Sequence, residues 1–122
     1  MAPLPVIFDS YPRTPKVWGE EILLCNTDFY CAKLLQIHHG MQCSLHMHPL
    51  KCETFIVLEG RPLITIDKFT EEKWPGDQVY IPRGTYHRFA GARFGAVLLE
   101  ISTHHDDRDV VRKEESGPTL HD

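Results

Sequence analysis

The fold of this chain is decided by the stretch from Gly40 to Gly60, which reads GMQCSLHMHPLKCETFIVLEG. His46 and His48 stand two residues apart, so on an extended strand both imidazoles leave the same face. Glu53 follows a short break and opens a second apolar strand, and a turn at the break would return its carboxylate to the imidazoles. The stretch therefore predicts a divalent metal site, with two surface histidines and an edge glutamate as the alternative.

A second run, from Gly76 to His87, reads GDQVYIPRGTYH. It contains a glycine, a short apolar strand and a Pro-x-Gly turn, and it ends on another histidine. His87 is therefore a fourth candidate ligand.

Together the two runs resemble the paired motifs of the cupin superfamily. The first motif, G-x5-H-x-H-x4-E-x6-G, closes at Gly60, and the second, G-x5-P-x-G-x2-H, closes at His87. The chain departs from the family pattern at Gly91, where the second motif often ends in Asn. The resemblance implies an all-β, single-domain cupin double-stranded β-helix, or jelly-roll barrel, with metal ligands His46, His48, Glu53 and His87.

Short strands with Gly and Pro turns recur along the chain, and no stretch has a convincing helical period. In residues 30–39, Lys33 shares one strand face with Leu35 and Ile37. We expect an extended, proline-rich arm over 1–15, the barrel over 16–103 and a polar, loosely packed tail over 104–122. Further strands are expected at Leu45–His48, Thr54–Leu58, Pro62–Ile66, Gln78–Ile81, Tyr86–Phe89 and Ala96–Ser102.

Composition excludes several function classes. The chain has 122 residues and a formal charge of −4 with no basic stripe, which argues against a nucleic-acid partner. No segment approaches the length of a membrane span, and residues 1–10 lack a signal-peptide pattern, so we expect no membrane partner and a cytoplasmic protein. The four cysteines fit neither a CxxC motif nor a zinc ribbon, and we expect reduced packing residues.

Three neutral imidazoles and one carboxylate leave two positions of an octahedral divalent ion open. Mn²⁺, Fe²⁺, Co²⁺, Ni²⁺ and Zn²⁺ all suit such ligands. Two adjacent open positions match a hydroxy-carbonyl group, which a sugar presents at C1 and C2.

Segments outside the motifs extend the resemblance to the small sugar-isomerase cupins, namely the D-lyxose isomerases and the mannose-6-phosphate isomerase-like proteins. These segments are KVWGEE at Lys16–Glu21, KLL at Lys33–Leu35, SLHMH at Ser44–His48, KCETF at Lys51–Phe55 and EISTH at Glu100–His104. The resemblance implies a metal-dependent aldose–ketose isomerase that acts on a sugar or sugar phosphate, usually with Mn²⁺.

Such a reaction needs a base that moves the C2 proton. Glu100 is the candidate because it lies near the end of the last apolar strand with the parity of Leu98, although it could instead face solvent. Lys33, if inward, would stabilise an oxyanion or bind a phosphate. Three further positions are candidate substrate contacts: Lys51, either Glu20 or Glu21, and Tyr80. Lys51 could instead lie in a solvated turn, and Tyr80 could instead be a core residue.

Two other classes use the same ligands. An Fe²⁺ cupin oxygenase would offer its two open positions to O₂ and substrate, and should have an apolar pocket. A non-catalytic, sugar-binding cupin is the second alternative. For every class we expect a homodimer, because the barrel has exposed sheet edges and the arm is rich in proline.

Overall fold

The computed structural model describes residues 8–119, and these form β-strands and loops without an α-helix. No helix in this part of the chain is long and apolar enough to cross a membrane. The strands are β1 (Arg13–Lys16), β2 (Gly19–Asn26), β3 (Cys31–Ile37), β4 (Met41–Gln42), β5 (Leu45–Met47), β6 (Glu53–Gly60), β7 (Leu63–Ile66), β8 (Phe69–Glu72), β9 (Gln78–Ile81), β10 (His87–Ala90), β11 (Ala96–Ser102), β12 (Val111–Glu114) and β13 (Gly117–Pro118).

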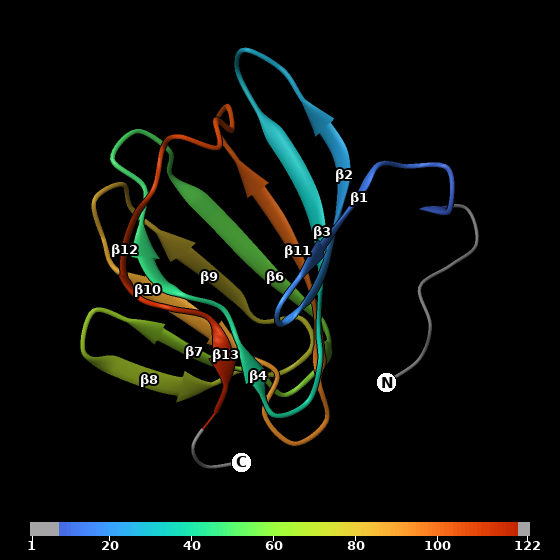
Figure 1. The fold of residues 1–122 in the computed structure, drawn as a ribbon, viewed down its shortest axis with the longest axis vertical. Coiled ribbons are helices and arrows are strands. Elements are labelled where there is room, and N and C mark those ends of the chain that lie inside the picture. Colours follow the sequence, from blue (N-terminus) through green and yellow to red (C-terminus); the bar gives the residue numbers. More distant parts are fainter. Residues whose placement is uncertain (1–7, 120–122) are drawn as a thin grey trace.

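Two antiparallel sheets curve around a common interior (Figure 1). One has the strand order β1-β2-β3-β11-β6-β9. The other has the order β12-β5-β10-β4-β13, and the β7–β8 hairpin joins it through β10. The predicted all-β jelly-roll barrel is therefore confirmed.

Alternation along the inner strands separates an apolar end of the barrel from a charged end. In β3, Leu35 and Ile37 are buried in the core, and Lys33 on the same face lies one pleat further along. Glu100 pairs with Lys33 across β11 and β3, and Leu98 pairs with Leu35. The same inward face thus changes from aliphatic to ionisable towards the end of the barrel where β11 finishes.

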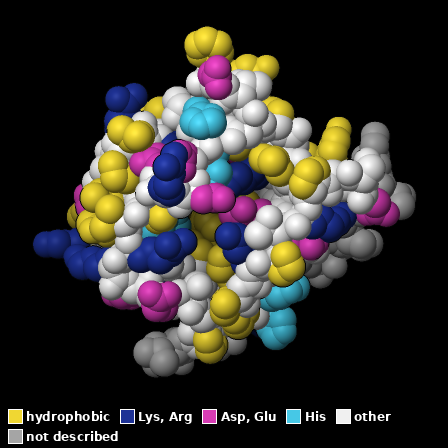
Figure 2. Space-filling model, turned by 45° about the horizontal axis from the view of Figure 1, so that its top comes forward, with side chains coloured by type: hydrophobic (Ala, Val, Ile, Leu, Met, Phe, Trp, Pro, Cys, Tyr) yellow, Lys and Arg dark blue, Asp and Glu magenta, His cyan; other side chains and the backbone are white. Residues whose placement is uncertain are grey.

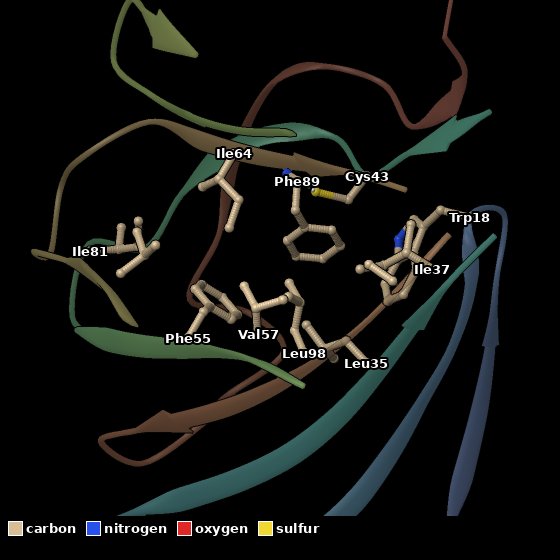
Figure 3. Close-up of a cluster of buried hydrophobic side chains, with 12 residues drawn as sticks. Trp18, Leu35, Ile37, Cys43, Phe55, Val57, Ile64, Ile81, Phe89 and Leu98 are labelled. Carbon is tan, nitrogen blue, oxygen red and sulfur yellow. Dashed lines mark hydrogen bonds between the residues drawn. The ribbon is translucent and has the colours of Figure 1, made fainter. Parts of the chain in front are cut away.

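Aromatic and aliphatic side chains from both sheets fill the apolar end (Figure 3). Trp18 and Phe89 pack edge to face with ring centroids 5.2 Å apart, and Phe89 contacts Phe55 across the interior. Trp18 is 6% exposed, as expected of a core residue. Cys43 also lies in this cluster, and all four cysteines are free thiols.

The C-terminal segment differs from the loosely packed tail expected after Thr103. β12 pairs with β5, and β13 pairs with β4, so the segment completes one edge of the second sheet. The side chains of β12 are exposed, which means that backbone hydrogen bonds hold the strand. A hydropathy pattern does not detect such a strand because Val111 is its one apolar residue and is itself exposed.

The described part of the N-terminal arm includes a strand of the chain's own sheet. Residues 1–7 lie outside the described residues, but Arg13–Lys16 forms β1 and pairs with β2 of the same chain. This part of the arm therefore extends the chain's own sheet.

Gly91 explains the departure from the second cupin motif. A Cβ atom at this position would lie 2.2 Å from the carbonyl oxygen of His38. The close approach of the two backbone segments leaves no room for Asn or any other side chain.

Candidate metal centre

The two sheets bring four of the predicted residues to the charged end of the barrel. His46 lies on β5 and pairs directly with His87 at the start of β10. His48 follows β5 by one residue, and Glu53 opens β6. His87 and Glu53 are buried, at 2% and 3% exposure.

Backbone carbonyls orient all three imidazoles in the same way. The Nδ1 atom of His46 lies 2.8 Å from the oxygen of Ser44, and Nδ1 of His87 lies 2.9 Å from the oxygen of Thr85. His48 Nδ1 lies 2.7 Å from the carbonyl oxygen of Asp109. Since a carbonyl only accepts, each Nδ1 carries the proton, and each Nε2 lone pair remains free.

The free nitrogens converge on one point. The ligand atoms of His46, His48 and His87 all lie within 4.8 Å of one another. Glu53 adds its carboxylate, with Oε1 3.5 Å from His48 Nε2 and Oε2 2.9 Å from His87 Nε2. Glu53 Oε2 and His87 Nε2 are buried, and neither makes a hydrogen bond within the described residues. Two lone-pair atoms held so close without a proton between them fit a shared cation.

The protonation states also suit a metal ion. Burial lowers the pKa of His46 to about 3 and lowers the pKa of His48. Burial opposes ionisation of Glu53, but two neighbours outweigh it and lower the pKa of the carboxyl. These are His87, through the hydrogen bond that it donates when Nε2 carries a proton, and the charged Lys51. Neutral imidazoles beside a carboxylate are the donor set that a divalent cation requires.

A buried ammonium joins this cluster to the second carboxylate. Lys51 Nζ lies 3.1 Å from Glu53 Oε1 and 3.2 Å from Glu100 Oε2. The two carboxylates raise the pKa of Lys51 although burial alone would lower it. Burial, and then the charge of Glu53, raise the pKa of Glu100.

These groups open into one cavity of about 310 Å³. Its hollow lies at the barrel end that faces the viewer in Figure 2, surrounded by acidic and basic side chains. Lys33 and Glu21 form an ion pair of 3.5 Å on the cavity wall, where Glu21 rather than Glu20 points inward. The cavity also contains His46, His48, Lys51, Glu53 and Glu100.

The family of the chain follows from this fold and from its match to a family model. Residues 33–102 match the model of the cupin domain. The chain belongs to the cupin family. The matched segment runs from Lys33 to Ser102 and includes the three clustered histidines, Glu53 and Glu100.

Curated relatives of this cupin include two sugar isomerases. It is 31% identical to the D-lyxose ketol-isomerase of Cohnella laeviribosi, over 70% of this chain and 62% of the relative. It is 30% identical to the D-lyxose/D-mannose isomerase of Thermosediminibacter oceani, over 74% of this chain and 65% of the relative. The cupin thus spans less than two thirds of the length of these relatives.

Solved structures share the fold of this cupin at low sequence identity. The R92A mutant of Bacillus subtilis oxalate decarboxylase OxdC has a TM-score of 0.78 at 17% identity, covering 86% of this chain and 31% of that one. KdgF from Halomonas sp. has a TM-score of 0.68 at 16% identity, and the match covers 73% of this chain and 81% of that one. Both likenesses concern the fold alone.

Two predicted site residues of this cupin do not line the cavity, namely the buried His87 and Tyr80. Tyr80 is 59% exposed on β9, where Val79 and Ile81 occupy the inward positions. Tyr80 therefore lies away from the cavity and does not occupy the core position that was its alternative. Strand parity alone does not say which face of β9 is buried.

The C-terminal segment contributes residues to the site of this cupin that were not predicted, among them His105 and Asp109. His105 Nδ1 lies 2.9 Å from Lys51 Nζ. Asp109 accepts from His48 through its carbonyl oxygen, and its Oδ1 accepts from the backbone nitrogen of Leu50 at 2.9 Å. The resemblance to EISTH ends at His104, and a backbone contact such as that of Asp109 leaves no trace in the residue type.

Proposed function

We propose that this cupin is a metal-dependent aldose–ketose isomerase of a sugar or sugar phosphate. The observation that carries the proposal is the buried contact between Lys51 and Glu100 on the cavity wall, beside the three-histidine cluster. A cavity of about 310 Å³ suits a small molecule. The names of the two isomerase relatives support the same reaction class.

We assign the metal to His46, His48, Glu53 and His87. Imidazole and carboxylate ligands accept Mn²⁺, Zn²⁺, Fe²⁺, Co²⁺ or Ni²⁺. The resemblance to the sugar-isomerase cupins is the reason to favour Mn²⁺. When bound, such an ion supplies Lewis acidity to the oxygens on C1 and C2 of the sugar.

Glu100 acts as the base in this proposal. Its carboxylate takes the proton from C2 and returns it to C1, while the proton of the C2 hydroxyl passes to the oxygen on C1, so that an aldose becomes a ketose. The raised pKa of Glu100 brings the carboxyl closer to neutral pH, where a general base works best.

Cationic groups complete the site. Lys51 holds the Glu100 carboxylate in place through their 3.2 Å contact. Lys33, which pairs with Glu100 across the two strands, stabilises negative charge on the substrate oxygen or binds a phosphate. Glu21 orients Lys33 and lies on the cavity wall as a substrate contact.

The buried charges argue against an Fe²⁺ oxygenase. An oxygenase pocket should be mostly apolar around the iron, whereas Lys33, Lys51 and Glu100 are all buried at this cavity. A non-catalytic sugar-binding cupin has no need of a buried base.

A screen in D₂O tests the proposal. Pentoses, hexoses and their phosphates are incubated with Mn²⁺-loaded protein, and deuterium at C2 or C1 is measured by NMR. We expect incorporation together with the ketose product. Binding without incorporation would instead identify a sugar-binding protein, and sugar-dependent consumption of O₂ would identify an oxygenase.

A further inference from the structure

We propose that His105, held by Asp107, is a positioning residue that fixes the Lys51 ammonium between Glu53 and Glu100. The functional part of this inference rests on the proposed isomerase reaction. Its structural part concerns the hydrogen bonds of Lys51 and is independent of any turnover.

The hydrogen bonds of Lys51 are complete only with His105. An ammonium has three N–H donors. Two meet carboxylate oxygens of Glu53 and Glu100, at 3.1 and 3.2 Å, and the third meets Nδ1 of His105 at 2.9 Å. Lys51 is 3% exposed, so water does not readily replace a lost acceptor.

Asp107 selects the tautomer in which Nδ1 of His105 can accept a hydrogen bond from Lys51. Oδ1 of Asp107 lies 2.7 Å from Nε2 of His105 and draws the imidazole proton to that nitrogen. Nδ1 is then unprotonated and presents its lone pair to Lys51. Burial, together with the charges of Lys51 and Lys33, lowers the pKa of His105 and keeps the ring neutral.

The backbone of His105 is fastened to the end of β2. The amide group of Asn26, at the end of β2, donates to the carbonyl oxygen of His105 at 2.9 Å and accepts from its backbone nitrogen at 3.0 Å. His104 contacts the carbonyl oxygen of Thr27 through Nδ1 at 2.8 Å. The position of the imidazole is thus set by the β2–β3 hairpin, far from Lys51 in the sequence.

The consequence concerns the geometry of the base. A lysine side chain has four rotatable bonds, and without the third acceptor its ammonium can rotate away from Glu100. The carboxylate would lose a fixed partner at the point of proton transfer. Loss of His105 should therefore slow the chemical step more than it weakens substrate binding.

The first test is an NMR measurement on the metal-free protein. Long-range ¹H–¹⁵N spectra of the imidazole report which nitrogen carries the proton. We expect His105 protonated at Nε2 alone at neutral pH, and the ammonium hydrogens of Lys51 protected from exchange with water. A ring protonated at Nδ1, or an unprotected ammonium, would overturn the proposal even if the protein is an isomerase.

The second test compares variants in the deuterium-exchange assay. His105→Leu should lower kcat by roughly 10- to 100-fold with little change in KM. His105→Asn restores a hydrogen-bond acceptor for Lys51 and should recover part of kcat. The kcat of Asp107→Leu should lie between those of wild type and His105→Leu. His39→Leu, at an exposed histidine away from the cavity, is the control.

Each outcome separates the two proposals. If no sugar is turned over by wild type, the proposed function fails, and the NMR result alone decides the role of His105. Equal kcat for His105→Leu and wild type would overturn the positioning role. Equal loss of activity in His105→Leu and His105→Asn would also exclude that role, because a role in packing alone would not distinguish an acceptor from a methyl group.

Discussion

Nζ of Lys51 lies 3.2 Å from Oε2 of Glu100, in a part of the barrel where both side chains are almost fully buried. The two residues are 49 positions apart in the sequence, with Lys51 just before β6 and Glu100 on β11. This contact ties the proposed base to the proposed metal centre, because Lys51 also contacts Glu53.

Glu100→Gln should remove the base and keep the metal. The amide has nearly the same shape but takes up no proton, so we expect deuterium exchange at C2 to fall by roughly 10²- to 10⁴-fold. Metal content by elemental analysis should be unchanged, since Glu100 is outside the histidine cluster. Glu71→Gln, at an exposed strand, is the matched control. Normal exchange in Glu100→Gln would exclude this residue as the base.

Lys51→Met should destabilise the metal-free protein. The substitution leaves two buried carboxylates without their shared cation, and breaking a buried ion pair in this way costs roughly 3–5 kcal/mol. Urea unfolding measures the loss, with Lys68→Met as an exposed control of the same chemistry. A cost no greater than that of Lys68→Met would mean that the Lys51 contacts contribute little to stability.

The metal-free protein should lose stability in mild acid. The pKa of His46 is 6.5 in the unfolded chain and about 3 in the folded protein, so the folded imidazole takes up a proton only in much stronger acid. Within this window the unfolded state binds more protons, so stability falls as pH decreases, by up to about 1.4 kcal/mol per pH unit for each such group. The lowered pKa of His48 acts in the same direction.

Urea unfolding of the metal-free protein at pH 7 and pH 5 measures this loss. His46→Gln removes one of the groups and should show a smaller difference between the two pH values. An identical difference in wild type and His46→Gln would show that the His46 imidazole does not resist protonation.

Gly91→Asn, which restores the usual residue of the cupin motif, should destabilise this cupin. The new Cβ would lie 2.2 Å from the His38 carbonyl oxygen, and forcing the two segments apart should cost at least about 1–3 kcal/mol. Gly117→Ala is the control, because a Cβ atom there meets nothing within 4 Å. Thermal unfolding of the two variants compares the costs, and equal midpoints would contradict the steric explanation.

The sequence predicts those parts of the site that depend on strand parity and on local motifs. His46 and His48 share a face, and Lys33 and Glu100 have the inward parity of Leu35 and Leu98, as the structure has them. The failures have a common physical cause. Parity orders the residues of Tyr80's strand but does not choose its buried face, and the packing of Val79 and Ile81 in the core makes that choice.

The contribution of the C-terminal segment could not be predicted from the sequence. β12 is held by backbone pairing, and Asp109 acts on His48 through a carbonyl group that every residue type possesses. His105 reaches Lys51 only because Asn26 anchors its backbone across 79 positions. Long-range contacts of this kind leave no local pattern.

The central claim is that three imidazoles and one carboxylate, carried by the β5 segment, β6 and β10, bind a single divalent ion. Elemental analysis of purified protein dialysed against Mn²⁺, combined with titration calorimetry, tests it most directly in wild type, His87→Ala and the exposed control His39→Ala. We expect one ion per chain in wild type and His39→Ala and loss of the bound ion in His87→Ala. Full stoichiometry in His87→Ala, or no metal in wild type, would contradict the account.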